Sequence, residues 1–208
     1  MIRNTFFWAF VASATVLSIS ACSNSNKINP KAISLNNKAV EVMIETQDFV
    51  RMNELLDSAL LIQPDYDVAM RNKITVLVNL GRLSDVETLL SEMKDICPDE
   101  NVLIELGMYY DYRGDTIKAI KYYDEAEKRI LQSVKKRKGK ELFPLYSSLW
   151  VVRFLKNESI KLESTEELMS NYSNEDYSRM KLFFDELRMR GKSRFIHDTF
   201  SPTLSMEL

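Results

Sequence analysis

An apolar pattern recurs along this chain at a nearly constant interval. Three segments of equal length, 47–64, 81–98 and 114–131, follow one another with almost the same spacing between their starts. Each has apolar or small residues at its sixth, tenth and thirteenth places, and steps of four and three put these on one helical face. These residues are Met52, Leu56, Ala59, Val86, Leu90, Met93, Ala119, Tyr123 and Ala126. Because another helical run precedes each segment, the pattern predicts three two-helix repeats over residues 32–131.

A period of about 34 residues with two helices per unit is the signature of a tetratricopeptide repeat (TPR), and the spacing of the three segments matches it. The third unit resembles this family most, since the positions that the family reserves for Leu-Gly, Tyr, Gly, Ala, an aromatic residue and Ala hold Leu106-Gly107, Tyr110, Gly114, Ala119, Tyr123 and Ala126. The second unit keeps the turn glycine as Gly81, whereas the first has Gln47 there. The resemblance implies an all-α fold, a short TPR-like solenoid of helical hairpins.

Residues 132–208 depart from the period and are predicted to form a C-terminal helical capping region. The stretch 141–156 is apolar nearly all round, which indicates a helix buried on most sides. Ser164 and Ser173 are predicted N-caps, and the second precedes a stripe of apolar residues at steps of three and four. A solenoid needs such a terminal element to close its last hydrophobic edge.

A basic run, Lys135–Lys140, separates the repeats from this cap. Cations at the C-terminus of a helix complement its dipole and stay solvated, which is one explanation for the run. The other is contact with phosphate or acidic lipid. Because such attraction decays over a Debye length of about 8 Å, lipid contact requires a tether that holds the run close to the membrane.

The amino terminus indicates export. Arg3 precedes an apolar stretch of about fourteen residues, shorter than the roughly 20 that a membrane-spanning helix needs. It ends in Ile19-Ser20-Ala21-Cys22, which resembles the bacterial lipobox. The resemblance implies that residues 1–21 are a lipoprotein signal peptide, that Cys22 becomes the lipid-modified mature N-terminus, and that residues 22–31 form a flexible tether. Ser23, rather than Asp, at the next position points to the outer membrane, with the periplasmic or surface face undetermined.

The lipobox interpretation of Cys22 also determines what is expected of the other cysteine, Cys97. A thioether at Cys22 excludes an intrachain disulfide, because Cys97 is the only other cysteine. Cys97 lies on an apolar stripe just before Pro98. The interpretation therefore predicts that Cys97 is a buried packing thiol.

Composition and charge exclude several classes of function for this chain. The chain has 208 residues, of which 45% are hydrophobic and 28% charged, so it should fold. The formal net charge of −2 excludes strong generic attraction to nucleic acid. One histidine, His197, and two cysteines are too few for a His/Cys metal site. No catalytic motif is present, so we expect no enzymatic activity and no cofactor beyond the covalent lipid on Cys22.

The resemblance also implies where a partner would bind. In TPR proteins the first helix of each unit lines a concave groove, and transferred by position its candidate partner-binding residues are Arg71, Thr75, Asn79, Asn101, Met108, Asp111 and Tyr112. We expect a protein or peptide partner in the cell envelope, bound by an interaction module or scaffold. The alternative is a periplasmic receptor for a small ligand or peptide, with its pocket between the repeats and the C-terminal helices, near Trp150.

Overall fold

The computed structural model describes residues 28–97 and 99–201, and in these ranges the chain is all-helical, without a strand. The all-α prediction is therefore confirmed. The α-helices are α2 (Pro30–Glu45), α3 (Phe49–Ile62), α4 (Asp67–Asn79), α5 (Leu83–Ile96), α6 (Glu100–Tyr112), α7 (Thr116–Val134), α8 (Leu142–Leu155), α9 (Ser159–Ser170), α10 (Asn174–Arg190) and α11 (Lys192–Phe200). A short 3-10 turn, η1 (Gly139–Glu141), precedes α8.

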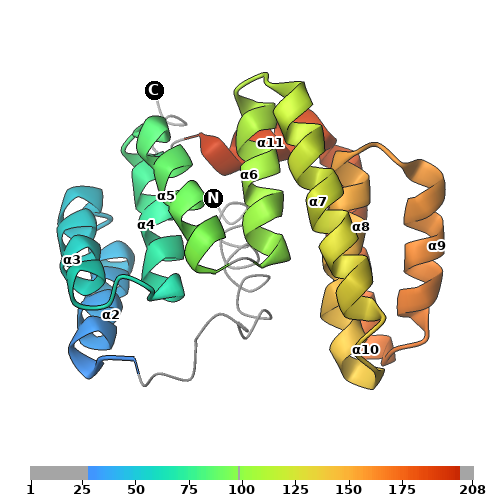
Figure 1. Cartoon of the computed structure of the whole chain (residues 1–208), viewed down its shortest axis with the longest axis horizontal. Helices are drawn as coiled ribbons and strands as arrows, with labels where there is room; N and C mark the ends of the chain where they lie inside the picture. The colour runs from blue at the N-terminus through green and yellow to red at the C-terminus, as the bar shows by residue number, and fades with distance from the viewer. Residues whose placement is uncertain (1–27, 98, 202–208) are drawn as a thin grey trace.

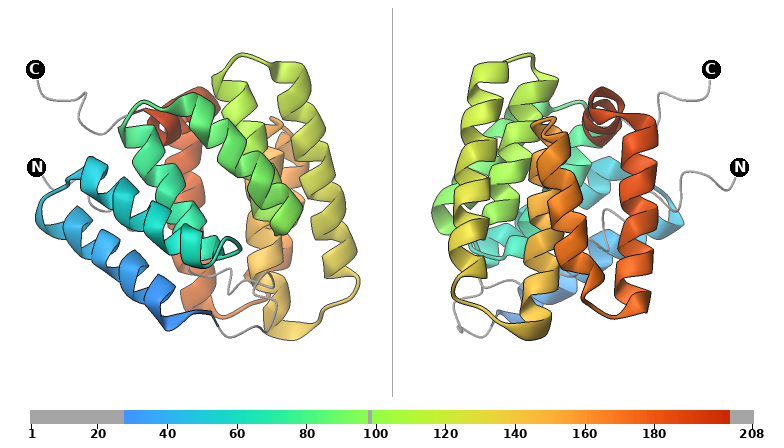
Figure 2. Two further views of the ribbon diagram at one scale, coloured as in Figure 1. Left: turned by 60° about the vertical axis from the view of Figure 1, so that its left-hand side comes forward. Right: turned by 90° about the vertical axis from the view of Figure 1, so that its right-hand side faces the viewer.

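The helices from α2 to α9 stand in a row in chain order, and each packs against the next (Figure 1). The last two helices, α10 and α11, turn back along the row, and α11 contacts α6 (Figure 2). None of the helices within residues 28–97 and 99–201 is both long and apolar enough to cross a membrane.

Three turns of the row share a left-handed backbone, at Gln47 (φ 53°), Gly81 (φ 70°) and Gly114 (φ 80°). Two of them close with the same hydrogen bond, because the amide after each glycine donates to the carbonyl five residues earlier, at 2.8 Å in both cases. Glycine adopts positive φ without cost. Gln47 adopts it despite its side chain, which explains why the turn is less easily recognised from the sequence.

A fourth turn of the same kind joins α8 to α9. Asn157 has a φ of 59°, and the Glu158 amide donates to the Arg153 carbonyl at 2.9 Å. Asparagine is the residue that tolerates this conformation best after glycine. The chain therefore continues the hairpin pattern beyond residue 131, where the sequence analysis placed its end.

Close helix contacts explain the small residues of the third unit. Ala119 and Ala126 are buried on α7. A Cβ atom built on Gly107 of α6 would overlap ring carbons of Tyr123 on α7. Because Tyr123 is itself fully buried, only glycine lets the two helices approach this closely.

The C-terminal helices share one hydrophobic core with the helices before them. One cluster of buried residues runs from α4 to α11, and α8 contributes Trp150 at its centre. The Trp150 ring stacks on Phe184 of α10, with ring centroids 3.8 Å apart, and its indole nitrogen donates to Glu166 of α9 at 2.8 Å. Ser173 caps α10, whereas Ser164 lies inside α9, so the second of these two cap predictions is confirmed and the first is wrong.

Candidate functional site

One of the three transferred groove positions on α4, Arg71, belongs to an internal ion-pair cluster. Arg71 reaches Asp99 at 2.9 Å and Glu105 at 2.6 Å, and its side chain is 15% exposed. The attraction of Glu105 raises the pKa of Arg71 above its usual range. Burial raises the pKa of Glu105, with Arg71 opposing it, and the second carboxylate oxygen of Glu105 is buried without a hydrogen-bond partner. Within the described chain Arg71 is thus already paired with two acids, and a partner's carboxylate would have to compete with them.

Four further groove positions are wholly or partly covered. Asn79 is buried and donates to the Thr75 carbonyl at 2.8 Å, and Thr75 is half-buried. Met108 is 6% exposed and belongs to the main core. Asn101 accepts a hydrogen bond from Ser148 of α8 at 3.4 Å. Position in the repeat therefore does not make these side chains accessible here, and for Asn101 the contact comes from α8.

The last two groove positions lie under α11. Lys192 of α11 pairs with Asp111 at 2.6 Å, and the Tyr123 hydroxyl donates to the same carboxylate at 3.2 Å. The Tyr112 ring packs against Phe200, with centroids 5.5 Å apart. A hollow of about 230 Å³ remains at this junction, lined by Asp111, Tyr112, Lys192, Ser193, Ile196 and His197. A helix of the chain itself thus occupies the place predicted for the partner.

His197 at this junction lacks the alignment of a catalytic base. Its ring nitrogens lie equally far, 3.2 Å, from the Ser201 hydroxyl, and its side chain is 68% exposed. A catalytic serine–histidine pair needs one nitrogen directed at the hydroxyl and the other held by an acceptor.

A second hollow of the described chain lies between α7 and α9. This cleft has a volume of about 480 Å³ and is lined by Asp124, Glu127, Lys128, Leu131, Gln132, Lys135 and Lys161. Lys128 and Lys135 are exposed and make no ion pair with any residue of the described part of the chain. The cleft wall nearest α8 is a polar network.

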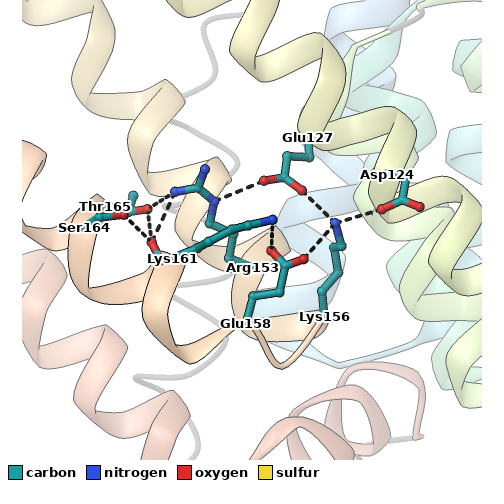
Figure 3. A network of polar contacts seen from close by, with 8 residues as sticks. All are labelled: Asp124, Glu127, Arg153, Lys156, Glu158, Lys161, Ser164 and Thr165. Carbon is teal, nitrogen blue, oxygen red and sulfur yellow. Dashed lines mark hydrogen bonds and ion pairs between the residues drawn. The ribbon is translucent and has the colours of Figure 1, made fainter.

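Glu127 is the centre of that network, which joins α7, α8 and α9 (Figure 3). Its two oxygens accept from Arg153 at 3.1 Å and from Lys156 at 2.7 Å. Lys156 also pairs with Asp124 and Glu158, at 2.7 and 3.2 Å, and Arg153 donates to the Thr165 hydroxyl at 2.6 Å. Each charge in this network has a close partner, so the network fixes the geometry of the cleft.

The pKa directions agree with this arrangement. Burial acts to raise the pKa of Glu127, but hydrogen bonds from Lys156 and Arg153 outweigh it and hold the pKa below its ordinary value. Burial acts to lower the pKa of Lys156, and hydrogen bonds to Asp124, Glu127 and Glu158 raise it instead. Both groups are therefore charged at neutral pH.

The sequence analysis missed this network, although a signal was present. Arg153 and Lys156 are two cations, three residues apart, on a helix that is otherwise apolar nearly all round. Cations in such a position need an acid on a neighbouring helix. By contrast, the space around Trp150 is filled by its own aromatic neighbours, and neither of the two hollows described above is lined by Trp150.

The two cysteines bear on the lipid prediction. Cys22 lies outside the described residues, so its lipidation stays a prediction. Cys97 is buried, as expected, but it is disulfide-bonded rather than a thiol, which corrects that expectation.

Within residues 28–97 and 99–201, no cluster of three His, Cys, Asp or Glu side chains could hold a metal ion.

Neither a protein-family model nor a curated protein matches this chain.

Proposed function

We propose that this protein is a lipid-anchored protein of a bacterial cell envelope, attached at Cys22 in the outer membrane. Its helices form TPR-like hairpins that act as an interaction module or scaffold for a protein or peptide partner. The lipobox-like Ile19-Ser20-Ala21-Cys22 supports the anchor, since the thiol and the small residues beside it are what lipid attachment and cleavage require.

One observation carries the repeat interpretation. The left-handed turns at Gln47, Gly81 and Gly114 fall on the first residues of the three repeated segments, so the backbone has the same period as the apolar pattern. The overlap that a Cβ on Gly107 would make with Tyr123 adds a physical reason for the Leu-Gly and aromatic positions of the third unit. Backbone geometry and sequence period therefore support the same TPR-like repeat.

The partner in this proposal binds the face of α6 that α11 covers. Lys192 is the charged contact of α11 with α6, through Asp111, and Tyr112 supplies an aromatic surface beneath it. The helix α11 has nine residues and follows Gly191, whose φ is 76°. A partner helix or peptide would have to displace α11 to reach the same side chains, so weakening the α11 contact should favour the partner.

The experiment is crosslinking and affinity capture from solubilised envelopes with a matched pair of variants. Lys192→Glu opposes Asp111 and weakens the docking of α11, whereas Lys121→Glu makes the same charge change on an exposed part of α7. We expect Lys192→Glu to capture more of the partner than wild type, and Lys121→Glu to capture the same amount. Equal or lower capture by a folded Lys192→Glu protein would place the binding surface elsewhere.

A second candidate function is a receptor for a small ligand or peptide in the cleft between α7 and α9. The cleft volume of about 480 Å³ favours it, since pockets for small molecules usually have about 300–1,000 Å³. A ligand of the folded state raises the melting temperature by mass action. Thermal stabilisation by a metabolite library that Lys128→Glu abolishes would support the receptor, and capture of a protein without such stabilisation would support the module.

A mass measurement can distinguish a lipid anchor at Cys22 from a disulfide between Cys22 and Cys97. A thioether on Cys22 and an intrachain disulfide exclude each other, because the chain has two cysteines. The mass of the mature protein before and after reduction decides which chemistry Cys22 has. A lipid-sized mass on the N-terminal peptide supports the anchor, and a reducible link between the two cysteine peptides refutes it.

A further inference from the structure

The loop between α7 and α8 carries the strongest local charge of the described chain. Residues 135–141 contain five cations and one acid, Glu141, for a local net charge of +4. All five cations are exposed, and none makes an ion pair with another described residue. The loop therefore presents a compact, unbalanced positive surface.

The fold explains only the beginning of this run. Lys135 is the C-cap of α7, where a cation complements the helix dipole. That effect falls off within the last turn of a helix. The helix α7 ends at Val134, and Lys138 and Lys140 lie beyond this end. The helix dipole therefore does not explain their charge.

This loop lies along the same lower edge of the molecule as the start of the described chain, but on the other side of the row of helices (Figure 1). The start of α2 and the end of α7 are both at the lower edge of all three views (Figures 1 and 2). Eight Cα–Cα steps separate Cys22 from Pro30, a reach of at most about 30 Å for a fully extended chain. An anchor at Cys22 would therefore hold the lower edge of the molecule, rather than the upper one, close to the bilayer.

We infer that the loop 135–140 contacts the anionic headgroups of the membrane in which the protein is anchored. This inference rests on the proposed anchor at Cys22. The contact orients the row of helices with the lower end toward the bilayer. Acids also lie along this edge, in the first turns of α4 (Asp67), α6 (Glu100) and α10 (Glu175 and Asp176), so the attraction is confined to the loop. Glu175 is paired with Arg179.

Each cation held near an anionic surface strengthens binding about fivefold, and the effect is lost beyond a Debye length of about 8 Å. Lys121 provides an internal control, because it is exposed on the same helix but fourteen residues before Lys135, about 21 Å along the axis. Contact through the loop should therefore shield Lys136 and Lys138 and leave Lys121 accessible.

The experiment uses the membrane-attached full-length protein in two kinds of vesicle, phosphatidylcholine alone and an equal mixture with phosphatidylglycerol. A water-soluble amine reagent labels the lysines, and mass spectrometry follows each site. We expect Lys136 and Lys138 to react at least about fivefold more slowly on the anionic vesicles, with no change at Lys121. High salt should remove the difference. The variant Arg137→Glu/Lys140→Glu should also remove it, and Lys121→Glu should not.

Equal labelling of the loop on both vesicles would overturn the inference. Slower labelling of Lys121 together with the loop would overturn the end-on orientation. Protection that appears only in native envelopes would assign the loop to an acidic protein instead. The mass of the N-terminal peptide tests the lipid anchor independently of the labelling. If the leader were not cleaved, it would still attach the chain by its N-terminus, and the labelling experiment would remain valid. A chain released from membranes altogether would overturn both proposals.

Discussion

Gly107→Ala tests whether the approach of α6 and α7 determines the residue at this position. The added methyl would overlap ring carbons of Tyr123, and this ring has no room to move. Tyr123 is fully buried, its hydroxyl donates to Asp111, and Lys192 lies over its ring at 5.6 Å from the centroid. The substitution should therefore force the two helices apart.

Two opposing effects set the magnitude. Overpacking in a well-packed core costs about 1–3 kcal/mol. Alanine stabilises the interior of a helix relative to glycine by about 0.5–1 kcal/mol. We expect Gly107→Ala to lower the free energy of unfolding by about 1–2 kcal/mol. In a chain of this size that corresponds to a fall in melting temperature of about 2–8 °C.

Tyr123→Val supplies the control background, because valine lacks the ring atoms that the new methyl would meet. There, Gly107→Ala should become neutral or stabilising by up to about 1 kcal/mol, as helix propensity alone dictates. The assay is urea unfolding of all four proteins, followed by helical circular dichroism and extrapolated to water. An equal loss in both backgrounds, or a gain in the wild-type background, would refute the close-approach argument.

Four other substitutions test the anchor, the helix face and the two ion-pair clusters. Cys22→Ala should abolish lipid labelling and leave an unprocessed or soluble product, as palmitate incorporation would show. Ala126→Leu should destabilise by about 1–3 kcal/mol, whereas its control Lys121→Glu should change stability by at most about 0.5 kcal/mol, both measured by thermal unfolding. Arg71→Ala should destabilise at pH 7 by about 3 kcal/mol and less at lower pH, where its buried carboxylate partner takes up a proton. Glu127→Gln should cost about 3 kcal/mol at pH 7, because Arg153 and Lys156 lose their shared acid.

The pH dependence of Glu127 has a definite sign. Its pKa is lower in the folded protein than its ordinary value of 4.5, so the folded state favours the carboxylate. The stability that it contributes is present above about pH 4.5 and is lost as the pH falls through the folded pKa. The difference in stability between wild type and Glu127→Gln should therefore shrink below about pH 4.5, and a constant difference down to acid unfolding would contradict the assignment.

The helices and their inner faces could be predicted from the sequence because they depend on local periodicity. Steps of three and four placed Ala119, Tyr123 and Ala126 on one face of α7, and all three are buried. The turn at Gly81 was predictable from another local signal, since glycine indicates a left-handed backbone conformation. Gln47 and Asn157 adopt that conformation without the residue type that signals it, so their turns were less certain or missed.

Contacts between distant helices could not be predicted, since periodicity carries no information on which helix covers which. Glu127 on α7 meets Arg153 and Lys156 on α8 only because the loop 135–141 returns the chain against the repeats. The sequence analysis predicted a buried helix over 141–156 but did not consider its two cations. Ser164 failed as a cap for a related reason, because α9 begins five residues earlier, directly after the turn at Asn157.

The groove positions show why transfer by repeat position is weakest in a short array. Met108 falls on a transferred groove position, yet it is buried in the main core. Apolar side chains on an inner face must be covered, and in a long solenoid successive units leave a groove between them. Here the three predicted units are followed by four further helices of the described chain, α8 to α11, and α8 and α11 contact the face of α6 instead. An apolar groove residue such as Met108 is thus covered within the chain, and any partner of this face of α6 has to compete with α11.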